Sequence, residues 1–70
     1  MFLLNNIDEA IKFYKNSIEL NPKQVDARVN LGIAYYFKGK IDLAAEQFNE
    51  VLKIDPNNEK AITYIKKMRE

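Results

Sequence analysis

Apolar residues recur along this chain with the period of an α-helix in four successive segments, residues 6–20, 25–38, 41–54 and 58–69. Within each segment, apolar side chains lie three or four positions apart, which brings them onto a common face of a helix. The pattern therefore predicts an all-α fold of about four helices.

The four predicted helices differ in how much of their circumference is apolar. Apolar side chains fill one half of the helix at 6–20 and a narrower stripe of the helix at 41–54. They surround nearly the whole helix at 25–38, so this helix is expected to have neighbours on several sides. Residues 58–69 are apolar on one side only, which is typical of the last helix in a packed row.

Prolines, a glycine and an asparagine predict where the helices begin and end. The residue before a proline is disfavoured in the α region, so Pro22 and Pro56 each mark the end of the helix before them. Gly39 is expected to end the second helix in the left-handed conformation. Asn6 is a candidate N-cap for the first helix, because asparagine side chains accept hydrogen bonds from first-turn N–H groups.

A glycine in the middle of the second helix calls for a packing explanation. Gly32 costs about 1 kcal/mol of helix propensity relative to alanine. Because glycine has no side chain, a neighbouring helix can approach closely at this point. We expect Ala44 of the third helix to lie against it.

Pro22 and Pro56 are 34 residues apart, which is the period of the tetratricopeptide repeat. Residues that match at the same shift are Ile7 and Ile41, Asp8 and Asp42, Ala10 and Ala44, Tyr14 and Phe48, Leu20 and Ile54, and Ala27 and Ala61. Residues 25–58 carry a skeleton of Leu31, Gly32, Ala34, Tyr35, Gly39, Ala44, Phe48, Leu52 and Pro56. In these features nearly the whole chain closely resembles the tetratricopeptide repeat family. It departs at Arg28, where the family often has an aromatic residue.

The resemblance implies an α-solenoid of antiparallel helix pairs in a single domain over residues 1–70. In this interpretation residues 1–24 hold the second helix of an incomplete repeat, and residues 25–58 form one complete repeat. Residues 59–70 are then a C-terminal capping helix. Lys66 takes the place that Gly32 has one repeat earlier, so no further helix is expected against that surface.

The composition is that of a folded and nearly neutral module. The chain is 47% hydrophobic and 30% charged, which excludes a disordered segment. A net charge of +1 provides no field that would gather nucleic acid or an anionic membrane, and no apolar run reaches the roughly 18 residues of a membrane span. Cysteine is absent, which is compatible with a reducing compartment, and we predict a cytoplasmic location.

The sequence offers little for catalysis or for nucleic-acid binding. Histidine and cysteine are absent, so Ser17 and Thr63 lack the usual base that would activate a hydroxyl. Asp8 and Glu9 are adjacent on a helix and point apart, so they make a poor carboxylate pair. The aromatic run at 35–37 is not interleaved with basic residues, as it is in single-strand binders. We expect no enzymatic activity and no cofactor, metal ion or nucleic acid.

In the family, the first helix of each repeat lines a concave groove that holds partner peptides or helices, so the resemblance implies a protein or peptide partner. Ile33, Tyr36 and Phe37 are left over once the interior has been assigned, and exposed apolar clusters of this kind form interaction hot spots. Packing against neighbouring helices is the alternative for these three. The positions that match the family's groove are Asp26, Val29, Asn30, Ile33, Tyr36, Phe37, Lys60, Thr63, Tyr64 and Lys67.

Some members of the family clamp the C-terminal carboxylate of chaperone tails. Asn30 and Lys60 match two positions of that clamp, but Tyr64 stands where an arginine is required. The resemblance therefore favours a hydrophobic peptide or helix over an acidic tail.

The first helix has apolar residues that nothing later in the chain is expected to cover completely. Arrays of this kind generally need about three repeats to be stable, so we expect a homodimer formed by isologous docking or by exchange of a helix. The turn at residues 37–40 is a candidate hinge. The alternative function is therefore a self-assembling structural unit without a foreign ligand. The predicted self-association face consists of Phe2, Leu3, Ile7, Ile11, Phe13, Tyr14 and Ile18.

Overall fold

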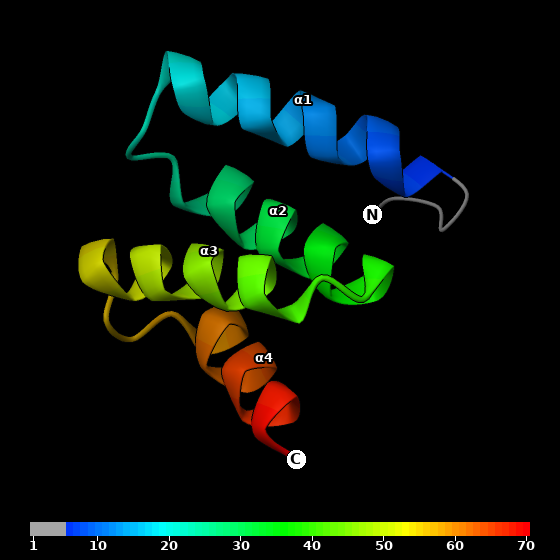
Figure 1. Ribbon diagram of the computed structural model, residues 1–70. Coiled ribbons are helices and arrows are strands. Elements are labelled where there is room, and N and C mark those ends of the chain that lie inside the picture. Colours follow the sequence, from blue (N-terminus) through cyan, green and yellow to red (C-terminus); the bar gives the residue numbers. More distant parts are fainter. Residues whose placement is uncertain (1–5) are drawn as a thin grey trace.

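The computed structural model describes residues 6–70, which form the helices α1 (Ile7–Leu20), α2 (Val25–Lys38), α3 (Ile41–Ile54) and α4 (Glu59–Arg69). The helices follow one another in chain order, and α2 and α3 run in opposite directions (Figure 1). The predicted all-α fold is confirmed, and α1 and α4 begin one residue later than predicted.

Short turns end the first three helices as predicted. Asn21 and Asp55 precede the two prolines and have nearly the same backbone angles, φ −146°, ψ 89° and φ −134°, ψ 85°. Gly39 has φ 85°, in the left-handed region. The N–H groups of Gly39 and Lys40 bond to carbonyl groups in the last turn of α2, with N···O distances of 3.1 and 2.9 Å. These bonds satisfy carbonyls that the helix end would leave unpaired.

The side-chain cap is found on α4 instead of α1. Asn6 stands at the N-cap position of α1, as predicted, but its side chain makes no cap hydrogen bond. Its backbone angles, φ −115° and ψ 19°, lie outside the extended region that N-cap residues adopt. Asn58 is extended at φ −63° and ψ 114°, and its side-chain oxygen accepts a hydrogen bond of 3.0 Å from the N–H of Ala61.

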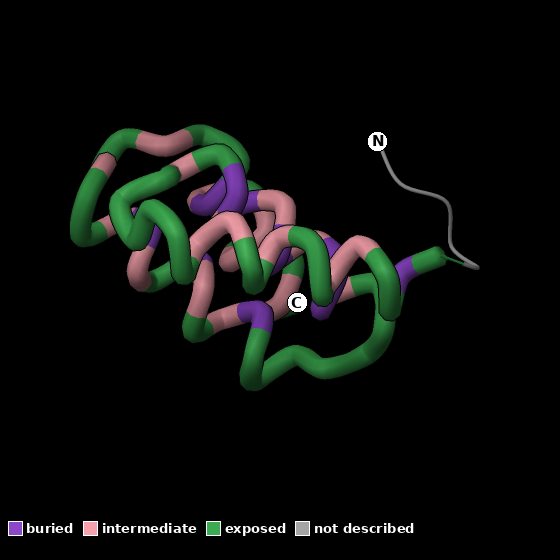
Figure 2. The backbone as a smooth tube through the Cα atoms, turned by 90° about the horizontal axis from the view of Figure 1, so that it is seen from above, coloured by how far each residue is buried: buried purple, intermediate pink, exposed green. Residues whose placement is uncertain are grey.

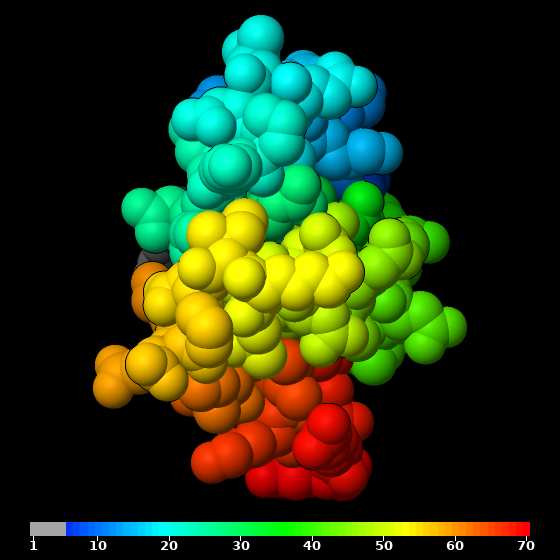
Figure 3. Space-filling view, turned by 90° about the vertical axis from the view of Figure 1, so that its left-hand side faces the viewer, coloured from blue at the N-terminus to red at the C-terminus, as the bar shows by residue number. Residues whose placement is uncertain are grey.

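The hydrophobic core is built around α2, which contacts all three other helices. This explains why α2 is apolar on nearly its whole circumference. Figure 2 shows the buried positions on the inner sides of the helices, and Figure 3 shows α1 and α4 at opposite ends with α2 and α3 between them. The buried residues that contact one another in the central cluster are Val29, Leu31, Tyr35, Ala44, Phe48, Val51 and Ala61.

Gly32 allows α2 to approach α3, but its closest partner is Phe48. The three atoms nearest to the position of a Cβ on Gly32 all belong to the Phe48 ring, at 2.7, 2.8 and 3.1 Å. The prediction that Ala44 fills this place was therefore wrong. Ala44 is fully buried in the same core, but the larger ring takes the space that the missing side chain leaves.

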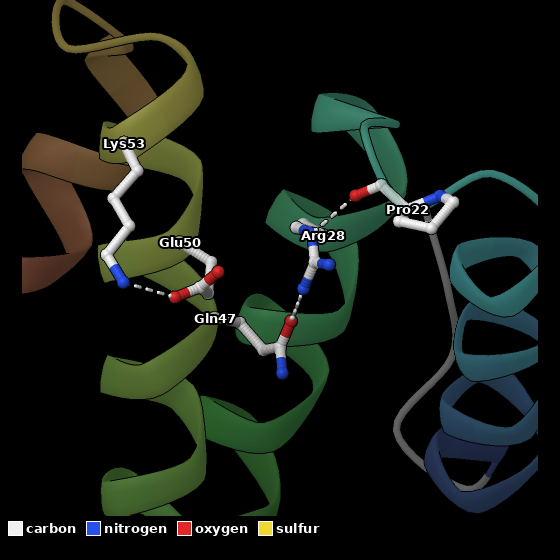
Figure 4. Close-up of polar contacts among 5 residues, drawn as sticks. All are labelled: Pro22, Arg28, Gln47, Glu50 and Lys53. Atoms are coloured by element: carbon white, nitrogen blue, oxygen red, sulfur yellow. Dashed lines mark hydrogen bonds and ion pairs between the residues drawn. The ribbon is translucent and has the colours of Figure 1, made fainter.

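Arg28 on α2 connects the α1–α2 loop to α3 through two side-chain hydrogen bonds (Figure 4). Its Nε donates a hydrogen bond of 3.0 Å to the carbonyl oxygen of Pro22 in the α1–α2 loop. Its Nη1 donates one of 3.2 Å to Oε1 of Gln47 on α3. The guanidinium thus ties the loop to α3 at the position where the family often has an aromatic residue.

Two surface ion pairs lower the pKa values of their carboxyl groups. Lys38 at the end of α2 forms a hydrogen-bonded ion pair with Asp8 in the first turn of α1, and this bond lowers the pKa of Asp8. Within α3, Lys53 lies 2.9 Å from Glu50 (Figure 4) and lowers the pKa of Glu50 in the same way. Only the first pair connects two helices.

Replacing Gly32 with alanine should destabilise the protein, although alanine has a helix propensity about 1 kcal/mol better than that of glycine. The added methyl group would overlap the ring of Phe48, which is fully buried and has little room to move. We expect a loss of about 1–3 kcal/mol in the free energy of unfolding, measured by urea denaturation. The matched control is Gly32→Ala in a Phe48→Leu background, where the smaller side chain should make the same change neutral or stabilising. Stabilisation in the wild-type background would contradict this packing.

Replacing Asp8 with asparagine should lower the free energy of unfolding at neutral pH and leave it unchanged in acid. Because the pKa of Asp8 is lowered by folding, its contribution is present above the unfolded-state pKa and disappears as the pH falls through the folded-state value, below 3.8. Urea denaturation at about pH 7 and about pH 2 measures the change. Asp42→Asn, the equivalent first-turn substitution in α3, measures the helix-dipole part alone. If Asp8→Asn and Asp42→Asn lowered the free energy of unfolding equally at both pH values, the ion pair would contribute nothing to stability.

Candidate functional site

Aromatic side chains of α2 and α4 meet on one side of the molecule. The rings of Tyr36 and Tyr64 pack edge to face with centroids 5.3 Å apart, and Phe37 packs on Tyr36 in the same way at 5.5 Å. Tyr64 also stacks on the buried ring of Phe48 at 5.5 Å. We call Tyr36, Phe37 and Tyr64 the aromatic cluster. Aromatic contacts of this kind stabilise the ring positions by more than the burial of their surface alone.

The aromatic cluster is partly exposed, and so is the neighbouring Ile33. Phe37 has 52% of its surface exposed. Ile33, Tyr36 and Tyr64 are half-buried and also pack against the core. These side chains therefore contact neighbouring helices and still present apolar surface.

Three other predicted groove residues on α2 and α4 have different environments. Val29 is only 3% exposed and belongs to the core, so it contributes almost no surface for a ligand. Thr63 and Lys67 on α4 are exposed. The Nζ atom of Lys67 lies 5.5 Å from the centroid of the Tyr64 ring, within the range of a cation–π contact.

The remaining predicted groove residues line a polar depression of about 500 Å³ between the first turns of α2 and α4. Three carboxylates and one ammonium group line it, so a negatively charged ligand would be repelled. Asn30 and Lys60, the two residues that match the carboxylate clamp, are therefore in an unsuitable setting for that function. The lining residues are Asp26, Val29, Asn30, Asp55, Asn57, Asn58, Glu59 and Lys60.

The sequence did not predict that Asp55 and Glu59 would join this depression. Asp55 ends α3 and accepts a hydrogen bond of 3.2 Å from the side chain of Asn58 within the α3–α4 turn. In the sequence, only Lys60 pointed to this depression, because it matched a groove position and lies next to Glu59 in the first turn of α4.

The predicted self-association face on α1 is divided between the core and the surface. Ile7 is only 8% exposed, so it adds almost no surface to this face. Ile11, Tyr14 and Ile18 are half-buried and pack against the core. Phe13 is 65% exposed, whereas Phe2 and Leu3 lie outside the described residues.

Leu20, at the end of α1, is 89% exposed and was not included in the predicted face. α1 therefore keeps apolar surface at Phe13 and Leu20.

Residues 6–70 contain neither a metal site nor a membrane-spanning helix. No group of three or more acidic side chains is arranged to hold a metal ion. No helix in this part of the chain is long and apolar enough to cross a membrane.

The helix pairs, the 34-residue period and the glycine at the α2–α3 contact agree with a comparison to known families. A tetratricopeptide repeat model matches residues 1–66. The chain belongs to the tetratricopeptide repeat family. Tetratricopeptide repeats are non-catalytic and generally mediate protein–protein interactions.

Named relatives of this tetratricopeptide repeat chain are much longer than the part they share with it. A DnaJ homolog subfamily C member 7 homolog of Schizosaccharomyces pombe is 38% identical over 65 residues, which cover 93% of the chain and 14% of the relative. The BBSome complex member BBS4 of Bos taurus is 36% identical over 63 residues, or 89% of the chain and 12% of the relative. Photosystem I assembly protein Ycf3 of Acaryochloris marina is 34% identical over an alignment of 74 positions that covers 83% of the chain and 45% of the relative. The chain thus spans less than half the length of each.

Proposed function

We propose that this chain is a non-catalytic protein-interaction module that holds an apolar peptide or helix against the aromatic cluster of α2 and α4. The exposed ring of Phe37 carries this proposal, since it adjoins Tyr36 and Tyr64 and offers a large apolar contact outside the core. Aromatic side chains at the centre of a contact surface are enriched among residues that dominate binding energy.

The charged groups around the aromatic cluster indicate which side chains the bound segment should carry. Lys67 lies over one side of the Tyr64 ring and can pair with an acidic residue of the partner. The depression at the first turns of α2 and α4 carries the carboxylates of Asp26, Asp55 and Glu59, and favours a basic or amide side chain. A segment with apolar residues between a basic and an acidic end is therefore the expected partner. The names of two relatives refer to assemblies, the BBSome and photosystem I, and a role in protein assembly is part of this proposal.

Self-association is a second candidate function, and the α1 surface favours it. Phe13 and Leu20 on α1 are 65% and 89% exposed, and burying them against a second copy would stabilise a homodimer. The polar surface of α4, at the opposite end of the molecule from α1, supports a homodimer over an open row of copies. Thr63, Lys66 and Lys67 of α4 are exposed, as expected for the proposed capping helix.

The substitution Phe37→Ser tests the first candidate function. Peptides selected on the immobilised wild-type chain from a random-sequence library serve as probes, and isothermal titration calorimetry measures their affinity. We expect Phe37→Ser to weaken binding roughly tenfold or more, because loss of a hot-spot side chain costs about 2 kcal/mol. Sedimentation equilibrium should show the same oligomeric state for the variant and the wild type.

The matched control is Leu43→Ser, which removes an apolar side chain of α3 with 40% exposure outside the aromatic cluster. It should leave peptide affinity unchanged. If Phe37→Ser binds the peptides as tightly as Leu43→Ser does, the proposed contact surface is wrong. If Phe37→Ser instead breaks up an oligomer, self-association is the function of this surface.

A further inference from the structure

A groove of about 210 Å³ is lined by residues of α1, α2 and α3. We call it the Arg28 groove. Its residues on α2 are Arg28, Leu31 and Tyr35, which lie three or four positions apart and therefore share one face of the helix. Phe37 lies about 200° around α2 from Tyr35, so the groove and the exposed ring of the aromatic cluster are on different sides of this helix.

The hydroxyl group of Tyr35 has no hydrogen-bond partner within residues 6–70, although Tyr35 is only 8% exposed. No fully enclosed side-chain oxygen or nitrogen in this part of the chain lacks a partner, so the hydroxyl reaches solvent, and Tyr35 lines the groove. Tyrosine hydroxyls that are largely buried usually have a partner. The Tyr35 hydroxyl is therefore available to donate a hydrogen bond to a ligand in the groove.

The guanidinium group of Arg28 is held in place beside this hydroxyl group. Its Nε and Nη1 atoms donate to Pro22 and Gln47, whereas Nη2 has no partner among the described residues (Figure 4). Gln47 accepts through Oε1, so its amide nitrogen also remains available as a donor. A side chain that is already held in this way loses little conformational entropy when it binds a ligand.

The charge and size of the groove fit a single carboxylate beside an apolar group. Arg28 and Lys15 bring two positive charges and Glu19 brings one negative charge, so one positive charge is left uncompensated. Ile18 and Leu31 add apolar surface. The volume is below the roughly 300 Å³ at which small-molecule sites begin, so one protruding side chain suits it better than a small molecule.

We propose that the Arg28 groove binds the carboxylate of a glutamate or aspartate side chain from a protein partner, next to an apolar residue of that partner. The carboxylate accepts hydrogen bonds from Nη2 of Arg28 and from the Tyr35 hydroxyl. Hydrogen bonds of this kind, with an ionised partner, are roughly twice as strong as those between neutral groups. The site uses no residue of the aromatic cluster, so it stands independently of the function proposed above.

Nuclear magnetic resonance of the isotope-labelled full chain tests this proposal. The probe is the tripeptide acetyl-Leu-Glu-Leu-amide, whose only charge is on the glutamate side chain. We expect it to shift the Nε–H signal of Arg28 saturably, with a dissociation constant on the order of 1–10 mM, because one charge-assisted contact supplies little binding energy. The signal of Arg69, the other arginine, which is exposed on α4, should stay in place. The same peptide with glutamine in place of glutamate should bind roughly tenfold more weakly or not at all.

Substitutions in the full chain locate the bound carboxylate. Tyr35→Phe removes only the hydroxyl group and should weaken binding roughly tenfold. Its matched control is Tyr36→Phe, which removes a hydroxyl group from the aromatic cluster and should leave the affinity unchanged. Arg28→Trp introduces an aromatic residue, as the family often has here, and should fill the groove and abolish binding. The side-chain amide signal of Gln47 reports binding to all three variants, and thermal melting shows that they fold.

The proposal fails if the glutamate peptide leaves the Arg28 signal unmoved, if the glutamine peptide binds equally well, or if Tyr35→Phe binds as tightly as Tyr36→Phe. Equal shifts at Arg28 and Arg69 would show unspecific ion pairing only. An Arg28 signal that moves with protein concentration alone would assign the groove to a second copy of this chain instead.

Discussion

The contact between Gly32 and the ring of Phe48 determines how the rest of this structure is arranged. It brings α2 and α3 close enough for Phe48 to be fully buried, and Phe48 in turn supports Tyr64 through a stacked contact. Tyr64 then holds Tyr36 at the surface. The core contact and the proposed binding surface are thus linked through three aromatic rings, so changes in the core should affect the partner surface as well.

The repeat also explains why two surfaces of one small chain differ in character. α3 and α4 meet α2 on a surface that is apolar and closed. The equivalent surface of α1 and α2 carries Tyr14, Ser17 and Asn30 in place of Phe48, Val51 and Tyr64, and these three residues are half-buried. A hydroxyl or amide group at each of these positions lowers the cost of leaving part of this surface in water.

Most of the fold could be predicted from the sequence because its signals are local and repeated. The helix period, the residues before Pro22 and Pro56 and the left-handed Gly39 each act within a few residues. The partner of Gly32 was missed, because sequence spacing gives the helix face but not which of two side chains on the facing helix is closer. The carboxylates of Asp55 and Glu59 were missed for a similar reason, since a turn brings them to α2. Of the predicted site, the aromatic residues were placed together, whereas Val29 and Ile7 proved to be core residues.

Nuclear magnetic resonance of the folded chain tests the central contact most directly. We expect nuclear Overhauser effects between the α protons of Gly32 and the ring protons of Phe48. The Gly32 α protons should also show chemical shifts displaced from their random-coil values by the ring current. Random-coil shifts at Gly32 in a folded chain, with no Overhauser effect to Phe48, would contradict the packing on which the fold and the proposed binding surface depend.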